Sequence, residues 1–160
     1  MNTIKQMPAD ARVWVYQSNT ILSEIQVASI IQKGKDFIEH WAAHGAALNA
    51  SFDILYKRFI VIAVDEKQAQ ASGCSIDKSV AFIKLIEQEF NLQLLDRMQV
   101  AYRKGGEIEA CSLKEFEKLA NNGAVNAATI VFNNMITTKA GFDTTWEVPL
   151  KDSWQSRVLS

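Results

Sequence analysis

The sequence predicts an α+β protein with a ferredoxin-like, or split βαβ, core at residues 12–103. Predicted elements follow one another there in the order β-α-β-β-α-β, which is the order of that fold. One predicted strand, residues 59–64, is apolar at every position, as a central strand covered on both faces should be. The length of 160 residues with 48% hydrophobic content suits a single domain, residues 1–160, with its own core.

The first strand and the first helix have clear local signals. Residues 12–17, RVWVYQ, are β-branched and aromatic, which predicts a strand. Ser23 followed by Gln26 has the spacing of a capping box and predicts a helix start. Apolar residues then recur at helical spacing as far as Trp41, and Gly45 predicts a left-handed helix stop.

The remainder of the core is two strands, a helix and a strand. Residues 48–57 alternate between apolar and polar, which predicts a strand near a sheet edge, and 59–64 predicts the central strand. After a loop at 65–74, apolar residues at helical spacing predict the second helix, and 97–103 predicts the fourth strand. We expect the first and third strands to be the central pair and to run parallel.

Residues 104–160 predict a C-terminal β-α-β extension with a packed tail. Gly105-Gly106 predicts a turn into a short strand, and Ser112 with Glu115 predicts a helix that ends at Gly123. Residues 129–132 predict a last strand, and the apolar tail should pack back on the domain. If the helices cover one face of the sheet, this extension or a second copy of the protein must cover the other, which leaves a homodimer open.

Composition excludes several classes of partner. The net charge is −1 and the basic residues are spread along the chain, so we expect no nucleic-acid binding. No apolar run approaches the ~20 residues of a membrane span, and no signal-peptide core is present, so we expect a soluble, cytoplasmic protein. Two cysteines and two histidines without ligand spacing predict neither a metal site nor any cofactor.

Residues 72–79, SGCSIDKS, are the strongest candidate site. They open the second helix, where free amides and the helix dipole favour an anion, so Ser72, Gly73, Ser75 and Lys78 are candidate ligand-binding residues. The stretch is similar to a phosphate-binding P-loop, but Ser72 and Asp77 stand at its glycine positions, which excludes a nucleoside-triphosphatase. The alternative interpretation is a glycine turn whose serines merely cap the helix.

Cys74 is the candidate catalytic residue of this turn. The helix start and Lys78 one turn later would both favour its thiolate. His44 is expected at the far end of the first helix, too distant to form a dyad with it.

The predicted parallel pairing gathers further polar residues at the same place. Gln17, Asn19 and Thr20 follow the first strand and Asp65 follows the third, so we expect them to form one crevice with the turn at 72–75. These residues complete the candidate ligand-binding set. The alternative is ordinary loop chemistry, and Asn133 with Asn134 could likewise bind a ligand or satisfy neighbouring backbone groups.

Several segments together resemble an uncharacterised family of small bacterial proteins typical of the Bacteroidetes, whose members often carry the automatic label ABC-transporter ATPase. The similar segments are RVWVYQ, HWAAHG, YKRFIVIAVDE, ASGCSIDKS, DRMQVAYR, TIVFNN and WEVPLKDSW. The chain has neither a P-loop nor a signature motif, so the label does not transfer. The resemblance implies a bacterial cytosolic protein and supplies no activity.

A second, local likeness covers residues 102–132. A strand with Tyr102, a glycine turn, Ser112-Leu113 and the TIVF segment resemble the core of GYF-type peptide-binding modules. The Gly-Pro-Phe portion that builds their proline-binding surface is replaced here by Glu109-Ala110-Cys111.

Two functions therefore remain open from the sequence. The first is a protein that binds a small anionic ligand at residues 72–75, with Cys74 supplying thiol chemistry if it is an enzyme. The second is a non-enzymatic protein-protein interaction module that uses apolar surface. The sequence does not decide whether the protein is an enzyme.

Overall fold

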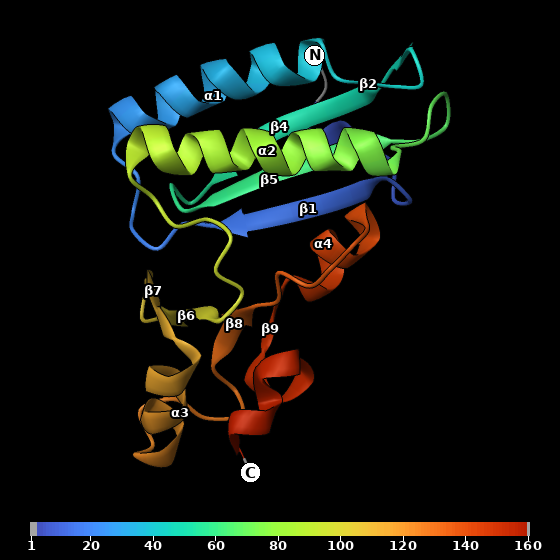
Figure 1. Ribbon diagram of the computed structural model, residues 1–160. Helices are drawn as coiled ribbons and strands as arrows, with labels where there is room; N and C mark the ends of the chain where they lie inside the picture. Colours follow the sequence, from blue (N-terminus) through green and yellow to red (C-terminus); the bar gives the residue numbers. More distant parts are fainter. Residues whose placement is uncertain (1–2, 160) are drawn as a thin grey trace.

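The computed structural model describes residues 3–159 and has two larger antiparallel sheets joined by a shared core, besides one small two-stranded hairpin (Figure 1). The first sheet has the order β1-β5-β4 and the second the order β7-β6-β8-β9. The strands of these sheets are β1 (Arg12–Gln17), β4 (Asn49–Leu55), β5 (Phe59–Asp65), β6 (Gln99–Lys104), β7 (Glu107–Ser112), β8 (Ile130–Phe132) and β9 (Glu147–Pro149). The helices are α1 (Glu24–Glu39), α2 (Gly73–Phe90), α3 (Leu113–Asn121) and α4 (Lys139–Thr145). The α+β class predicted from the sequence is confirmed.

The first sheet is antiparallel throughout, which corrects one expectation. β5 is central as predicted, but it pairs with β1 antiparallel, with Arg12 opposite Val64 and Gln17 opposite Phe59. The predicted parallel pairing of the first and third strands is therefore wrong. The hairpin from β4 into β5 reverses the chain, so β5 runs against both of its neighbours.

The fourth predicted strand does not join the first sheet, so the ferredoxin-like core is not confirmed. β6 pairs instead with β7 and β8 in the second sheet. Part of the outer edge of β1 is occupied by a distant segment, because the amide of Val13 donates to the carbonyl of Thr137 at 3.0 Å. That pairing takes up hydrogen-bonding groups that a fourth strand would need.

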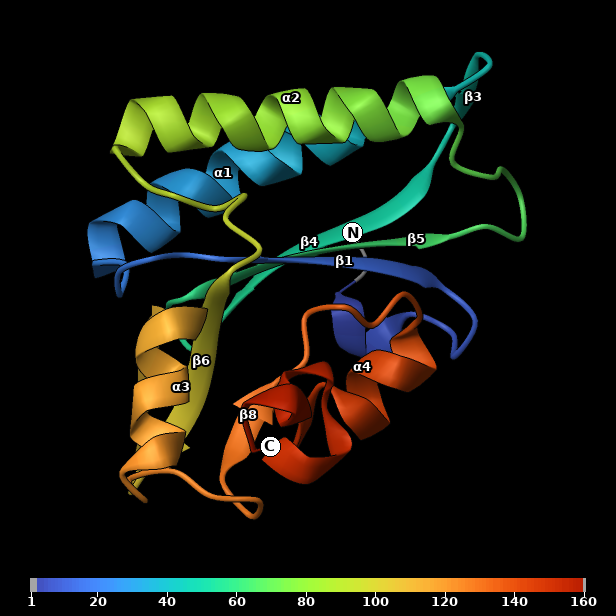
Figure 2. The same ribbon diagram turned by 60° about the horizontal axis from the view of Figure 1, so that its bottom comes forward.

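The two faces of β5 belong to two different cores, which is why every residue of 59–64 is apolar. Ile60, Ile62 and Val64 pack under α1 and α2, which lie side by side on one face of the sheet (Figure 1). Phe59, Val61 and Ala63 face the opposite way. That second face is covered by the 3-10 helix η1 (Ile4–Gln6) and by the C-terminal third, through Phe132, Ile136 and Trp146 (Figure 2).

The first helix starts as predicted and ends earlier than predicted. Ser23 and Gln26 form the predicted capping box, but α1 stops at Glu39 rather than at Gly45. His44 and Gly45 are instead the turn of a small hairpin of β2 (Ala42–Ala43) and β3 (Ala46–Ala47), where both have positive φ. Two consecutive left-handed residues are typical of a two-residue hairpin turn of type I′.

The second sheet carries the remaining helices. Gly105 and Gly106 make the predicted hairpin turn between β6 and β7, and the Ser112 side chain caps α3. The tail folds back as two 3-10 helices, η2 (Leu150–Asp152) and η3 (Trp154–Leu159). Trp146, Leu150 and Val158 are buried, whereas Leu159 is exposed. Among residues 3–159, the structure has no helix with the length and apolar content of a membrane span.

Candidate functional site

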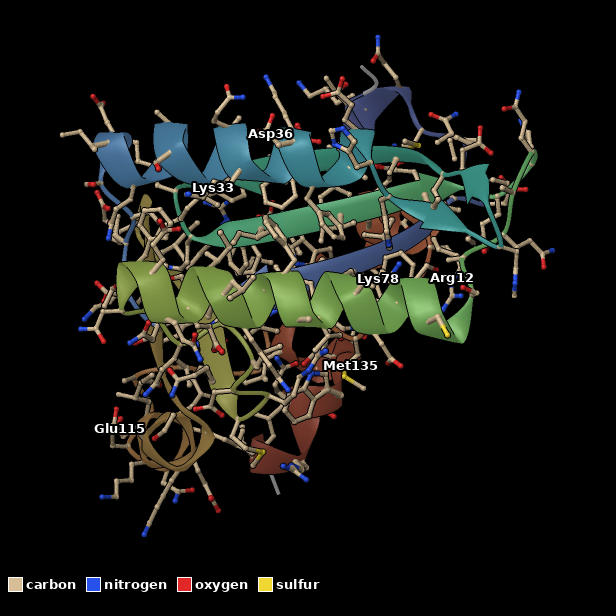
Figure 3. The ribbon with its side chains drawn as sticks, turned by 45° about the horizontal axis from the view of Figure 1, so that its top comes forward. Arg12, Lys33, Asp36, Lys78, Glu115 and Met135 are labelled. Carbon is tan, nitrogen blue, oxygen red and sulfur yellow. The ribbon has the colours of Figure 1, made fainter. Side chains whose placement is uncertain are left out.

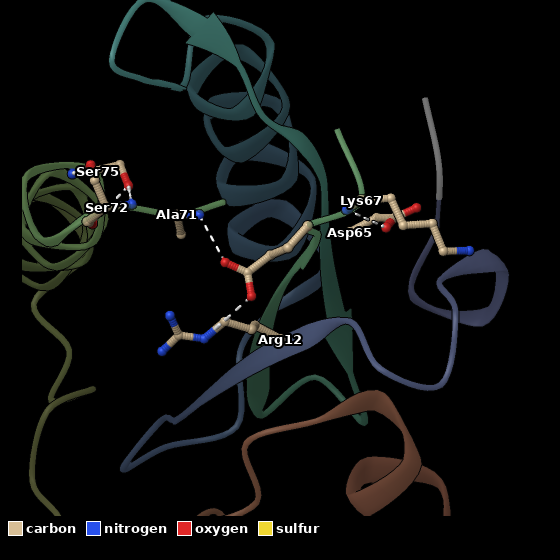
Figure 4. Close-up of polar contacts among 7 residues, drawn as sticks. Arg12, Asp65, Lys67, Ala71, Ser72 and Ser75 are labelled. Atoms are coloured by element: carbon tan, nitrogen blue, oxygen red, sulfur yellow. Dashed lines mark hydrogen bonds and ion pairs between the residues drawn. The ribbon is translucent and has the colours of Figure 1, made fainter. Parts of the chain in front are cut away.

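The predicted turn at 72–75 does open a helix, but its polar groups are largely used by the protein itself. The Ser72 hydroxyl accepts from the Ser75 amide at 3.1 Å, and the Ser75 hydroxyl accepts from the Ser72 amide at 2.7 Å. The Glu66 carboxylate accepts from the Ala71 amide at 2.8 Å (Figure 4). A carboxylate of the chain thus already occupies the Ala71 amide, just before the start of α2. Anion binding at this turn stays a prediction, and its capping geometry favours the simpler interpretation.

The remaining residues of the turn face solvent. Gly73, Cys74 and Lys78 are exposed, and Figure 3 labels Lys78 near the start of α2. Trp41 donates from its indole to the Ser75 carbonyl at 2.8 Å, so the segment after α1 lies against the start of α2. The expectation that His44 lies at the opposite end of the sheet from Cys74 is therefore wrong.

The predicted crevice does not form, because its two halves lie at opposite ends of the first sheet. Gln17 is opposite Phe59 in the register, whereas Asp65 follows Val64, the partner of Arg12. Asn19 accepts from the Gln93 amide just beyond the C-terminus of α2. Gln17, Asn19 and Thr20 are thus separated from Asp65, Ser72, Gly73, Ser75 and Lys78 along the length of β1. The prediction fails since it rested on parallel strands.

The segment after β1 instead wraps around the turn between β4 and β5. The Ser18 amide donates to the Arg58 carbonyl at 2.7 Å, and the Leu22 amide donates to the Lys57 carbonyl at 2.7 Å. The Arg58 guanidinium in turn donates to the Ser18 carbonyl at 3.2 Å. The segment that carries Gln17, Asn19 and Thr20 therefore contacts, through Ser18, an arginine that sequence analysis did not single out.

Arg58 is the most unusual charged residue in the described chain. It is only 6% exposed, and it forms no ion pair among residues 3–159. Burial lowers the pKa of its guanidinium, and the Glu109 carboxylate partly opposes this effect. A buried cation normally has a carboxylate or another anion as its partner, because its desolvation is otherwise uncompensated.

An open surface pocket of about 390 Å³ lies beside this arginine, and we call it the Arg58 pocket. Its size lies in the usual range of small-molecule sites. Two further cations line it, but each already has a partner: Lys57 pairs with Glu24 at 3.3 Å and Arg103 with Glu147 at 2.7 Å. The complete lining is Ile21, Tyr56, Lys57, Arg58, Arg103, Gly106, Glu107 and Ile108.

The wall of the Arg58 pocket is a strained turn. Tyr56 and Lys57 have φ of 55° and 53°, a conformation that L residues other than Asn and Gly rarely adopt. The Tyr56 ring stacks on Trp146 and its hydroxyl donates to Glu147 at 2.9 Å. These contacts bind the turn to the second sheet, so the strained backbone is held by tertiary packing.

Sequence analysis missed this site although two signals were present. The two strands at 49–55 and 59–65 are joined by YKR, with no Asn-Gly or other turn dipeptide. A basic residue also directly precedes a fully buried strand. The connection of Arg103 to Glu147 across 44 residues could not be read from local patterns.

The second cysteine is unsuited to nucleophilic chemistry. Burial, with a smaller effect of Glu115, raises the pKa of the Cys111 thiol to about 11. Among the described residues, no group of three His, Cys, Asp or Glu side chains is placed to hold a metal ion.

Comparison with protein-family models, with curated proteins and with solved structures found no match. The resemblances to a Bacteroidetes family and to GYF-type modules therefore stay predictions.

Proposed function

We propose that the protein binds a small anionic ligand, and that the Arg58 pocket is the binding site. The observation that carries the proposal is Arg58 itself, a buried arginine without an ion-pair partner in the described chain, at the wall of an open pocket of about 390 Å³. The proposal keeps the class of ligand that the sequence predicts, but its binding site is at the opposite end of β1 from residues 72–75.

The chemistry of the pocket supports an anion with an apolar portion. Arg58 would supply charge-assisted hydrogen bonds, which are stronger than neutral ones. Ile21, Tyr56 and Ile108 supply the apolar lining. Glu107 is the one acidic residue of the lining, so the cationic residues outnumber it.

The test compares two neighbouring cations. Thermal unfolding is measured with phosphate, sulfate and a series of small mono-, di- and tricarboxylates. A probe at 100 times its dissociation constant should stabilise the protein by about 2.7 kcal/mol, which corresponds to roughly 5–11 °C for a chain of this size. Arg58→Met should abolish the shift, whereas the matched control Lys57→Met should keep most of it because Lys57 is exposed and already paired.

Two results would contradict the proposal. One is that none of these probes stabilises the wild-type protein. The other is that the Arg58→Met variant, folded by circular dichroism, is stabilised as much as the wild type.

A non-enzymatic interaction module is the second candidate, favoured by two exposed isoleucines. Ile21 and Ile25 are 61% and 83% exposed around the start of α1. An apolar surface of this kind suits contact with a protein, including a second copy of this chain. Size-exclusion chromatography with light scattering should then show association with rising concentration that Ile25→Asp removes. A monomer at every concentration would leave the homodimer without support.

A further inference from the structure

A second, smaller cavity lies where the end of β1 meets the second sheet, and it shares no lining residue with the Arg58 pocket. We call it the junction cavity. Its volume is about 30 Å³, enough for about two water molecules or for one small functional group. Gln17 of β1, Phe132 of β8 and Gln155 of η3 are among its lining residues. Both glutamines are more than nine-tenths buried.

A chain of hydrogen bonds fixes the orientation of the Gln17 amide. The Trp146 indole can only donate, and it donates to Asn134 Oδ1 at 2.9 Å. Asn134 Nδ2 therefore faces Gln17 and donates to its Oε1 at 2.9 Å. This leaves Gln17 Nε2, a buried donor, without a hydrogen-bond partner. Rotating the amide to pair Nε2 would place two NH₂ groups against each other.

Gln155 has an unpaired acceptor where Gln17 has an unpaired donor. Its Nε2 donates to the Phe132 carbonyl at 3.3 Å, and a carbonyl can only accept, so this amide is also fixed. Its Oε1, a buried acceptor, has no partner. A free donor and a free acceptor thus belong to two side chains that line one cavity. Buried polar atoms in folded proteins are almost always paired, so these two atoms are candidates for pairing with a molecule that enters the cavity.

The other polar groups of the cavity narrow the chemistry of that partner. The Asp96 carboxylate already accepts from the Met98 amide and from Gln99. Arg97 lies over the Tyr16 ring, with its guanidinium carbon 5.9 Å from the ring centre. A carboxylate would place negative oxygens against Gln155 Oε1 and Asp96, and an ammonium would face Gln17 Nε2 and Arg97. A neutral group with a carbonyl beside an N–H complements both free atoms.

A larger groove continues from the junction cavity and offers room for the rest of such a molecule. It has a volume of about 370 Å³ and shares Val15, Arg97, Asn134 and Met135 with the cavity. Its remaining lining is mainly apolar and includes Trp14 and Ile136. Met135, which Figure 3 shows at the surface, lines both the junction cavity and the groove.

We propose that the junction cavity binds the carboxamide or lactam edge of a small molecule whose apolar body lies in the adjoining groove. The carbonyl of this group accepts from Gln17 Nε2, and its N–H donates to Gln155 Oε1. This site is independent of the Arg58 pocket and of the anion proposed there.

Three probes that share a benzoyl group test the proposal on the unmodified protein. Benzamide has the carbonyl and the N–H, N,N-dimethylbenzamide lacks the N–H, and benzoate replaces both by a carboxylate. Binding is followed by chemical-shift changes of the ¹⁵N-labelled glutamine side chains, a method suited to the millimolar affinity expected for a ligand this small. Benzamide should shift the Gln17 and Gln155 amide signals and bind about tenfold tighter than either other probe.

Two variants complete the experiment. Gln155→Met removes the acceptor while keeping the length of the side chain, and it should reduce the preference for benzamide over N,N-dimethylbenzamide about tenfold. Gln68→Met, at an exposed position outside the cavity, should leave the preference unchanged. The proposal is overturned if the wild type binds none of the probes, as it would if only water fills the cavity, or if it binds benzoate as well as benzamide.

Discussion

Alanine at position 34 should destabilise the protein, although the same change would strengthen an isolated helix. Gly34 lies within α1 at the point where the helix passes over Phe52 of β4. An added Cβ would lie 2.2 Å from Phe52 Cδ1 and 2.5 Å from Cγ, whereas ordinary contact begins at 3.4 Å. The ring is only 3% exposed and packs edge-on against Phe82, so it has little room to move away.

The magnitude follows from two opposing effects. Alanine in place of glycine in a helix gains about 1 kcal/mol. Overpacking a well-filled core costs about 1–3 kcal/mol, and three ring atoms at close distance place this site at the upper end. We therefore expect a net loss of about 2 kcal/mol in the free energy of unfolding, or roughly 4–8 °C in the melting temperature.

Urea unfolding followed by circular dichroism measures this loss, with Gly73→Ala as the matched control. Gly73 is also helical, but its Cβ would meet nothing within 4 Å, so this variant should be as stable as the wild type or more so. Phe52→Leu should rescue Gly34→Ala in part, because it removes the ring that the Cβ meets. The packing argument is wrong if Gly34→Ala unfolds at the same urea concentration as Gly73→Ala.

Three further predictions concern the hairpin turn, the thiols and one carboxyl. Lys57→Gly should stabilise the protein by about 0.5–1 kcal/mol in urea unfolding, because glycine adopts the positive φ of this position without strain. The surface ion pair of Lys57 with Glu24 contributes little, so its loss should not cancel this gain. A loss of stability would show that the turn is unstrained. At pH 8 a colorimetric thiol reagent should modify Cys74 alone in the folded protein, because the Cys111 pKa of about 11 leaves only ~0.1% of that thiol as thiolate. If the Cys74→Ser variant is still modified fast, this prediction is wrong. Burial, partly offset by the Ile4 amide, raises the pKa of Asp53 above 3.8, so its ionisation weakens the fold as pH rises from 3.8 through the folded value. Asp53→Asn should remove that part of the pH dependence in unfolding experiments from pH 3 to 7, and an unchanged profile would refute the assignment.

Local signals were sufficient for most elements of the fold. The bounds of β1, the capping box of α1 and the central position of β5 follow from side-chain chemistry within a few residues. The end of α1 was misread because Trp41 continues the helical spacing, although it lies after the helix and its buried side chain packs against the start of α2. A glycine stop and a hairpin turn both use positive φ, so Gly45 could not separate them.

The candidate sites depend on pairings between distant residues, which no local pattern contains. Whether β5 runs with or against β1 changes which loops meet, and burial alone is the same for both directions. Gln17 was named from the sequence, but its partner Asn134 lies 117 residues away. Arg58 was not named, because a basic residue in a turn is usually solvated and only its tertiary surroundings make it buried.

The division of β5 between two cores affects how the chain can fold while the ribosome is still making it. Strand β5 and both of its neighbours are complete once Asp65 has been added. Trp146, which covers the face of β5 that carries Phe59 and Val61, is added about 80 residues later. At roughly 5–20 residues per second, this interval lasts about 4–16 s. During that time η1 is already present but the C-terminal cover of Phe59 and Val61 is still missing, so the nascent protein exposes apolar surface that chaperones would recognise.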